Sequence, residues 1–310
     1  MDKLKIHCDK KNFNKITEEQ LLYFGKVENE IIKNNKTFRD INNEDINRII
    51  EYTDIENCDF IYYPYKISKN ENLTKLIEDS EKYDKKILLY YNDDDDEIFN
   101  FKNSIFFRTS IYKSKKPKNY FSVPAFCNDL KKENDYFFKE KNKTPVIGFC
   151  GSLTHRDRKT MIDVVKNSKN LSNNFIIRND FWGGKIWDHD IRQEYILNTL
   201  NSDFVICVRG AGNFSYRFYE TLCLGKIPLI LDTDMSFPFE DFINYDDKIL
   251  KINRDDLKNI EDIVYNFWEK IDEYVDFQKS MVKFWDNYLS PIGHIKTLNK
   301  YKYEINKLLH

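Results

Sequence analysis

The residues best suited to chemistry lie in the segment 204–232, which reads FVICVRGAGNFSYRFYETLCLGKIPLILD. Its first five residues form a continuous apolar run, which is typical of a strand that is buried on both faces. Gly210 and Gly212 follow, and glycine lets a backbone turn sharply or approach a ligand closely. A helix is predicted to begin near Phe214 or Ser215. Because its free N–H groups and its dipole favour anions, this order of elements predicts a phosphate site.

Polar side chains around this loop could hold a diphosphate and its ribose. Arg209 adds a positive charge directly after the strand, and Ser215 lies at the predicted helix start. Asn213, Arg217 and Glu220 are spaced i, i+4 and i+7, which predicts that they share one helical face. Arg217 can fork onto a diphosphate, and Glu220 can accept hydrogen bonds from ribose hydroxyls. The alternative is that Arg217 and Glu220 pair with each other on a solvated surface.

The predicted helix ends at a residue suited to that role. Gly225 is a natural C′ residue, and Pro228 lies near the start of the next strand, Ile227–Leu231. The glycine loop therefore follows a strand of a predicted parallel sheet. Ligands of open α/β sheets bind outside the carboxyl ends of such strands.

The pattern RG-x-G-N-x-S-x-R-x-x-E-x-L-x-x-G-x-I-P-L-I-L, followed by FPFEDF at Phe237–Phe242, resembles the exostosin-type glycosyltransferases. The resemblance covers roughly residues 145–245 and is weak over residues 1–123. It implies a GT-B fold, in which two Rossmann-like domains have parallel sheets that face a cleft and C-terminal helices brace both. It also implies a nucleoside-diphosphate sugar donor, usually a uridine one, with no obligatory metal or other cofactor.

A second glycine loop supports this interpretation. The predicted strand Val146–Cys150 leads into GSLTHRDR at 151–158 and then into a helix. The resemblance implies that Gly151 and a downstream arginine meet the donor phosphates. Arg158 matches best by its position at the helix start, and Arg156 is the alternative. His155 either contacts a phosphate or the sugar, or is an ordinary exposed histidine.

An acidic run follows the predicted strand Ile87–Tyr91 and reads NDDDDE at 92–97. Adjacent aspartates repel one another, so the run is either a solvated turn or a functional loop. Any run of four aspartates contains the D-x-D spelling of metal-dependent transferases, so that match carries little weight. An inverting transferase needs a group that accepts the acceptor's proton. We therefore nominate Asp93 or Asp94 as the base, and Arg108 as an acceptor-side residue.

Composition excludes several classes of function. The net charge of the 310 residues is −2, so no general attraction to nucleic acid is expected. None of the six cysteines forms a C-x-x-C pair, so neither a zinc site nor a disulfide framework is expected. The N-terminus has no apolar signal region, and the apolar runs are far shorter than the ~20 residues of a membrane span. We therefore expect a cytoplasmic protein that reaches a membrane only peripherally.

Strands and helices alternate along the chain, which predicts an α/β fold with parallel sheets. A first, acceptor-side domain is expected at 1–140, a nucleotide-sugar domain at 141–290, and a helix at 291–310 that packs back on the first domain. Strands are expected at Leu4–His7, Phe60–Tyr63, Ile87–Tyr91, Ser104–Arg108, Tyr120–Val123, Val146–Cys150, Phe175–Arg178, Phe204–Val208 and Ile227–Leu231. Helices are expected at Glu18–Asn34, Asp45–Thr53, Leu73–Tyr83, Arg158–Asn167, Ile191–Asn201 with Asp190 as N-cap, Asp255–Leu289 and Tyr301–Leu309.

The expected activity is a single displacement from a nucleotide-sugar donor to a glycan, glycolipid or glycoprotein acceptor. Arg158, Arg209 and Arg217 would stabilise the leaving diphosphate. Inversion at the anomeric carbon is implied by the resemblance alone. Two alternatives share the fold: a nucleotide-sugar epimerase or hydrolase, and a binding module without catalysis. A nicotinamide dehydrogenase is disfavoured because the loop reads RGAGNF instead of GxGxxG.

Overall fold

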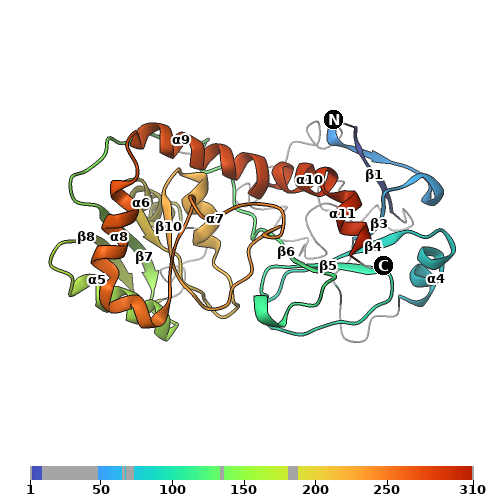
Figure 1. Cartoon of the computed structure of the whole chain (residues 1–310), viewed down its shortest axis with the longest axis horizontal. Coiled ribbons are helices and arrows are strands. Elements are labelled where there is room, and N and C mark those ends of the chain that lie inside the picture. The colour runs from blue at the N-terminus through green and yellow to red at the C-terminus, as the bar shows by residue number, and fades with distance from the viewer. Residues whose placement is uncertain are drawn as a thin grey trace. The chain divides into compact units, whose positions relative to one another are not determined.

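A computed structural model of the chain (Figure 1) describes residues 2–8, 48–64, 67, 73–132, 136–180 and 188–308. The chain divides into two compact units. Unit 1 comprises Met1–Asn128, Met235–Phe242 and Asn287–His310, and unit 2 comprises Asp129–Asp234 and Ile243–Asp286. Each unit has its own sheet of parallel strands, so the predicted α/β class with two parallel sheets is confirmed.

The sheet of unit 1 has the order β2-β1-β3-β4-β5-β6, and every neighbouring pair is parallel. Its strands are β1 (Leu4–His7), β2 (Ile50–Tyr52), β3 (Phe60–Tyr63), β4 (Lys86–Tyr91), β5 (Ser104–Arg108) and β6 (Tyr120–Ser122).

One helix expected in unit 1 is helical only at residues 48–49 of its described part. Within the range Asp45–Thr53, residues 50–52 form the edge strand β2, with Leu4 opposite Ile50. Ile50 is buried and β-branched, so pairing with β1 overrides the weak local helical pattern. The helix expected at Glu18–Asn34 lies outside the described residues.

Helices cover unit 1 on both faces of its sheet. Helix α4 (Thr74–Lys82) packs through Leu76 and Ile77 onto a core that includes Ile87 and Phe106. Two further helices among the described residues are α10 (Pro291–Lys300), which has a proline at its first position, and α11 (Lys302–Lys307). Figure 1 shows both in red beside the strands of this unit, and Lys302 donates to Asp59 at 2.8 Å. Short helical turns are η2 (Ile55–Asn57) and η3 (Lys113–Lys115).

The sheet of unit 2 has the order β11-β10-β9-β7-β8 and is also parallel throughout. Its strands are β7 (Val146–Ser152), β8 (Ser172–Arg178), β9 (Phe204–Ile206), β10 (Ile227–Leu231) and β11 (Leu250–Ile252). Its described helices are α5 (Arg156–Lys166), α6 (His189–Leu200), α7 (Tyr216–Cys223), α8 (Ile260–Glu269) and α9 (Tyr274–Phe284), with the turn η5 (Arg254–Asn259). The π-helical turn η6 (Trp285–Leu289) follows α9 and runs from the last residues of unit 2 into unit 1. Strand β11 was not expected, because its three residues lie in a polar stretch.

Helices α5 and α8 share one apolar cluster with the sheet, through Met161 and Val264. After β8 the chain returns past β7 to β9 and continues to β10, which is the opposite direction to the step from β7 to β8. Right-handed crossovers in that direction place α6 and α7 on the other face of the sheet. The N-cap of α6 is Asp188 rather than the expected Asp190, because the helix begins two residues earlier than the pattern suggested. The Asp188 carboxylate accepts the N–H groups of Asp190 and Ile191 at 3.1 and 3.2 Å. No helix in the described part of the chain is long and apolar enough to cross a membrane.

Candidate functional site

The strand order of unit 2 reverses between β7 and β9. From β7 the chain passes to β8 on one side and then returns to β9 on the other. Loops that leave neighbouring strands in opposite directions open a crevice at the carboxyl ends, where ligands of open α/β sheets bind. The two loops that meet there are the glycine loops predicted from the sequence. Arg158 joins them, since its Nε donates to the Arg209 carbonyl at 3.2 Å.

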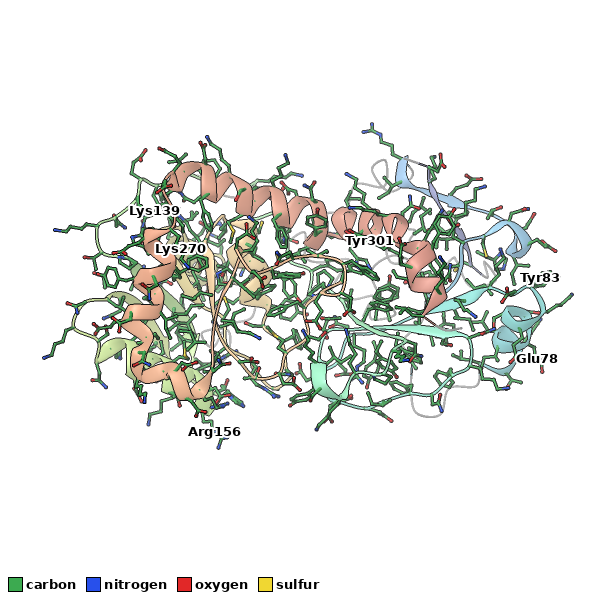
Figure 2. All side chains as sticks on the ribbon, in the orientation of Figure 1. Glu78, Tyr83, Lys139, Arg156, Lys270 and Tyr301 are labelled. Atoms are coloured by element: carbon green, nitrogen blue, oxygen red, sulfur yellow. The ribbon has the colours of Figure 1, made fainter. Side chains whose placement is uncertain are left out.

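Arg158 lies on the first turn of α5 and is only 9% exposed. Its Nη1 donates to the Ser152 carbonyl at 3.1 Å and lies 3.5 Å from the Thr154 hydroxyl. Burial, and then the nearby charge of Arg217, lower the pKa of Arg158 to about 10. The alternative residue, Arg156, has a side chain that is 86% exposed and lies at the outer surface in Figure 2. Of the two arginines, Arg158 is the one that enters the crevice.

Arg217 approaches the same crevice from the first turn of α7. Its Nη2 donates to the Cys150 carbonyl at 2.9 Å, and its guanidinium lies 4.4 Å from the centre of the Phe149 ring. Gly151 has φ +149°, and a Cβ there would lie 2.8 Å from Nη2 of Arg217. A Cβ at Gly210 would lie 3.2 Å from Nη2 of Arg158. Both predicted glycines therefore lie against the arginines of the crevice.

Neither guanidinium forms an ion pair with a carboxylate in the described part of the chain. Arg158 and Arg217 donate to backbone carbonyls and lie close enough to repel each other. Nε of Arg217 and the Ser152 hydroxyl are buried without a hydrogen-bond partner among the described residues. Buried polar groups normally find partners, so these atoms point to a ligand that supplies acceptor oxygens. The arrangement fits an anion such as a diphosphate.

Asn213 does not lie on the helix as expected. Helix α7 begins at Tyr216 with Ser215 as its N-cap residue, so Asn213 belongs to the loop before it. Asn213 is fully buried: its Oδ1 accepts from the Thr233 hydroxyl at 2.8 Å and its Nδ2 donates to the Thr233 carbonyl at 3.1 Å. An asparagine that bonds backbone groups favours a loop over a helix. Asn213 therefore fixes the loop after β9 to the loop after β10.

The rest of this loop and the far end of α7 are also fixed by hydrogen bonds. Arg209 Nη2 donates to the Ala211 carbonyl at 2.7 Å. Gly225 has φ +70° and follows the last helical turn, as predicted. The N–H of Lys226 donates to the Thr221 carbonyl at 2.9 Å, which is the bond of a Schellman cap.

Glu220 is buried and pairs with side chains that the sequence did not indicate. Arg192 Nη2 donates to its Oε1 at 2.7 Å, and the Tyr195 hydroxyl donates to its Oε2 at 2.6 Å. The alternative ion pair of Arg217 with Glu220 is therefore wrong. Arg192 and Tyr195 are i, i+3 neighbours on α6, but only the tertiary fold brings that face against α7. Burial, and then the charge of Glu220, raise the pKa of Tyr195.

His155 is the N-cap residue of α5. Its Nδ1 accepts the N–H of Asp157 at 3.3 Å, which requires an unprotonated nitrogen. Burial lowers the pKa of His155, and the charges of Arg209 and Arg158 lower it further, although Asp157 opposes this. His155 is therefore a neutral imidazole that caps α5, and its side chain is 30% exposed.

The acidic run lies in unit 1, at the carboxyl end of β4. Arg108 is fully buried, and its Nη2 donates to Asp95, at 2.7 Å to the carbonyl and 3.0 Å to the carboxylate. Partial burial opposes ionisation of Asp95, but hydrogen bonds from Tyr91, the Glu97 N–H and Arg108 lower its pKa overall. Asp93 is half-buried and Asp94 is exposed. Arg108 is thus bound to an aspartate that the sequence did not single out.

Comparison with protein families finds a match that covers the loops of the crevice. Residues 129–253 match the model of the RXYLT1 C-terminal domain. The matched range contains both glycine loops and both arginines of the crevice. The resemblance to the exostosin-type glycosyltransferases is confirmed, because the RXYLT1 family is exostosin-related. The RXYLT1 match supports a glycosyltransferase.

The solved structures that the chain resembles are distant in sequence, and no curated protein matches the chain. A glycosyltransferase from Rickettsia africae ESF-5 is 11% identical at TM-score 0.48, over 99% of this chain and 100% of that one. WaaG, a glycosyltransferase involved in lipopolysaccharide biosynthesis, is 8% identical at TM-score 0.38, over 94% of this chain and 99% of that one. The calicheamicin glycosyltransferase CalG4 is 8% identical at TM-score 0.38, over 78% of this chain and 73% of that one.

Proposed function

We propose that the protein is a glycosyltransferase that uses a UDP-linked sugar as its donor. It transfers the sugar to a hydroxyl of a glycan, glycolipid or glycoprotein. The observation that carries the proposal is the pair of arginines at the switch point of a parallel sheet, buried Arg158 and half-buried Arg217, which no carboxylate among the described residues neutralises. The RXYLT1 match over the same unit supports it.

In the proposed reaction the acceptor oxygen forms a bond to the anomeric carbon as the bond from that carbon to the diphosphate breaks. The diphosphate leaves with the electron pair, and the charge that develops on it is stabilised by Arg158, Arg217 and the N-terminus of α7. Asp93 or Asp94 takes the proton of the acceptor hydroxyl. Inversion and independence of metal ions or other cofactors are carried over from the exostosin-type resemblance.

The remaining donor-side residues have proposed roles that follow from their positions. We propose that Glu220, oriented by Arg192 and Tyr195, accepts hydrogen bonds from the ribose. Arg209 and Ser215 line the mouth of the crevice, and Asn213 and Gly210 shape the loop between them. His155 caps α5 and thereby sets the position of Arg158.

The proposed compartment is the cytoplasm. All six cysteines are buried free thiols, which supports a reducing environment. Nucleic acid is not proposed as a partner, and contact with a membrane is proposed only at its surface, where a glycolipid acceptor would lie.

The direct test is UDP release from a panel of UDP-sugars, with and without glycan acceptors. The panel includes UDP-xylose, because the matched family is a xylosyltransferase family. We expect release that depends on acceptor for at least one donor. Equal release without acceptor would instead indicate a hydrolase, and conversion of the donor sugar an epimerase. UDP binding without either reaction would indicate a binding module.

A further inference from the structure

Asp157 is a buried carboxylate next to Arg158 in the chain. It lies on the first turn of α5, and its side chain is only 2% exposed. Residues i and i+1 of a helix do not face the same side, and no hydrogen bond or ion pair joins these two side chains in the described part of the chain. A buried carboxylate is destabilising unless it is paired, so the identity of its partner is informative.

The partner of Asp157 is Arg254, the first residue of η5 after the edge strand β11. Its Nη2 donates to Asp157 Oδ2 at 2.6 Å. Two other basic groups lie further from the carboxylate: His155 Nδ1 at 3.5 Å is neutral, and Arg156 Nε at 3.8 Å belongs to an exposed side chain. Burial opposes ionisation of Asp157, but the hydrogen bond and the charge of Arg254 lower its pKa overall. The carboxylate is therefore ionised, and Arg254 is the main charge that compensates it.

The charge of Asp157 lies within reach of the crevice. The imidazole of His155 responds to both: burial lowers its pKa, Asp157 raises it, and Arg209 and Arg158 lower it further. Asp157 and the arginines of the crevice therefore lie close to the same ring. A negative charge this near to Arg158 would weaken the binding of a diphosphate there unless another charge compensates it.

We propose that Arg254 is a positioning residue of the donor site, which acts by binding the carboxylate of Asp157. Held by Arg254, this carboxylate neither neutralises Arg158 nor repels the diphosphate. The inference rests on the proposed function, since it needs a nucleoside diphosphate in the crevice. It gives a donor-site role to a residue outside both glycine loops.

A simpler role for the same ion pair would be to fasten η5 to α5. These elements already pack together through apolar side chains, because Leu257 of η5 and Met161 of α5 belong to one core cluster. The two roles also predict different signs. An effect of charge depends on the net charge of the Arg254–Asp157 pair, whereas a fastening role depends on the contact itself.

The test is a double-mutant cycle in the full chain. Arg254→Met leaves the carboxylate uncompensated, and Asp157→Asn removes its charge but keeps its shape and the backbone N–H that His155 accepts. The double variant R254M/D157N has no charge at either position. Arg254→Lys keeps the positive charge, and Arg156→Met removes an exposed charge from the same turn of α5 as a control. Calorimetric titration with UDP and with uridine gives Kd for each protein.

We expect R254M to raise the Kd for UDP about tenfold, the effect of one uncompensated charge about 10 Å from a dianion at an effective dielectric constant of about 50. D157N should bind UDP at least as tightly as the wild type, because the pair then carries a net positive charge. The double variant and R254K should return to within about twofold of the wild type, since the net charge of the pair is again zero. R156M should match the wild type because its exposed charge is screened. Uridine, which lacks the diphosphate, should bind all five variants like the wild type.

Two results would overturn the inference and leave the proposed function standing. One is UDP binding by R254M with the wild-type Kd. The other is a similar loss of UDP affinity in R254M, D157N and the double variant, which would show that the contact matters and the charge does not. If R254M does not fold, D157N and the double variant still decide, because neither holds an uncompensated carboxylate and weaker UDP binding by both contradicts the inference. If the wild-type protein does not bind UDP more tightly than uridine, the proposed function fails, and the inference fails with it.

Discussion

In unit 2, buried Arg158 and half-buried Arg217 hold two positive charges close together, and no carboxylate among the described residues pairs with either. Each is held by backbone carbonyls, and Arg217 also lies against an aromatic ring. Like charges at close range destabilise a protein that holds no ligand, and a bound dianion removes that repulsion. At the residue scale, removing one of these two charges should therefore weaken ligand binding without lowering the stability of the protein that holds no ligand.

Arg217→Met keeps a flexible side chain against Phe149 but removes the charge. We expect UDP affinity to fall about 10- to 100-fold, the range for lost hydrogen bonds to a charged group. The free energy of unfolding without ligand should not fall, because no ion pair is lost. Arg156→Met, at the exposed neighbouring position, should leave both quantities unchanged. Calorimetric titration and urea unfolding check this, and a stability loss in R217M with unchanged UDP affinity would contradict it.

The residue types of the donor site were predictable, but their partners were not. Glycine, arginine and helix-start signals are local, so Gly151, Arg158 and Arg217 could be placed from the sequence. The contacts of Glu220 with Arg192 and Tyr195 depend on how α6 packs against α7, which no local pattern specifies. Asn213 was placed on a helix because its spacing fitted one, yet its bonds to Thr233 hold it in the loop.

At the element scale, the end of β7 depends on a glycine. Gly151 adopts a φ that side chains rarely allow, and the space where its Cβ would lie is occupied by the Arg217 guanidinium. The same loop position could be recognised in the sequence, but the reason for the glycine comes from a helix 66 residues further along the chain, where Arg217 lies. Strand β2 was missed because its residues lie in a weak helical pattern, and β11 was missed because its three residues lie in a polar stretch.

Gly151→Ala should lower the free energy of unfolding by about 1–3 kcal/mol, the range for a side chain forced into a sparsely populated φ region. It should also weaken UDP binding, because Nη2 of Arg217 must move away from the new methyl group. Gly210→Ala, whose Cβ meets Arg158 less closely, should cost less stability. Urea unfolding of the two variants makes the comparison. Equal losses in both would show that the backbone of Gly151 is not strained.

At the scale of the whole molecule, two parallel sheets were predictable from alternating strands and helices, but the path of the chain between units was not. Residues 235–242 belong to unit 1, where Phe239 packs 5.2 Å from the ring of His294 and 5.9 Å from Phe107. Such packing of distant aromatic residues has no signature in the local sequence. The cleft between two facing sheets, which the resemblance implies, stays a prediction.

Unit 1 should lose stability in mild acid because of His294. Burial lowers the pKa of His294 to about 3, and the ring is surrounded by Tyr90, Phe107, Phe126 and Phe239. The unfolded chain binds a proton near pH 6.5, whereas the folded chain stays neutral down to about pH 3. Stability should therefore fall by about 1.4 kcal/mol for each pH unit below 6.5.

His294→Phe keeps an aromatic ring among aromatic neighbours and removes the titrating group, at the expense of the bond to the Tyr90 hydroxyl. We expect its stability to depend less on pH between 6.5 and 4 than that of the wild type. Urea unfolding at pH 7, 6 and 5 measures both slopes. Parallel slopes in the two proteins would show that His294 is not the group responsible.

The central claim is that unit 2 binds a nucleoside diphosphate through its unneutralised arginines. Thermal denaturation with UDP, with uridine and without ligand tests it most directly, since the two ligands differ only in the diphosphate. We predict that UDP at about 100 times its Kd stabilises the protein by about 2.7 kcal/mol and that uridine at the same concentration gives far less. No shift with UDP or any other nucleoside diphosphate, or equal shifts with UDP and uridine, would contradict the claim.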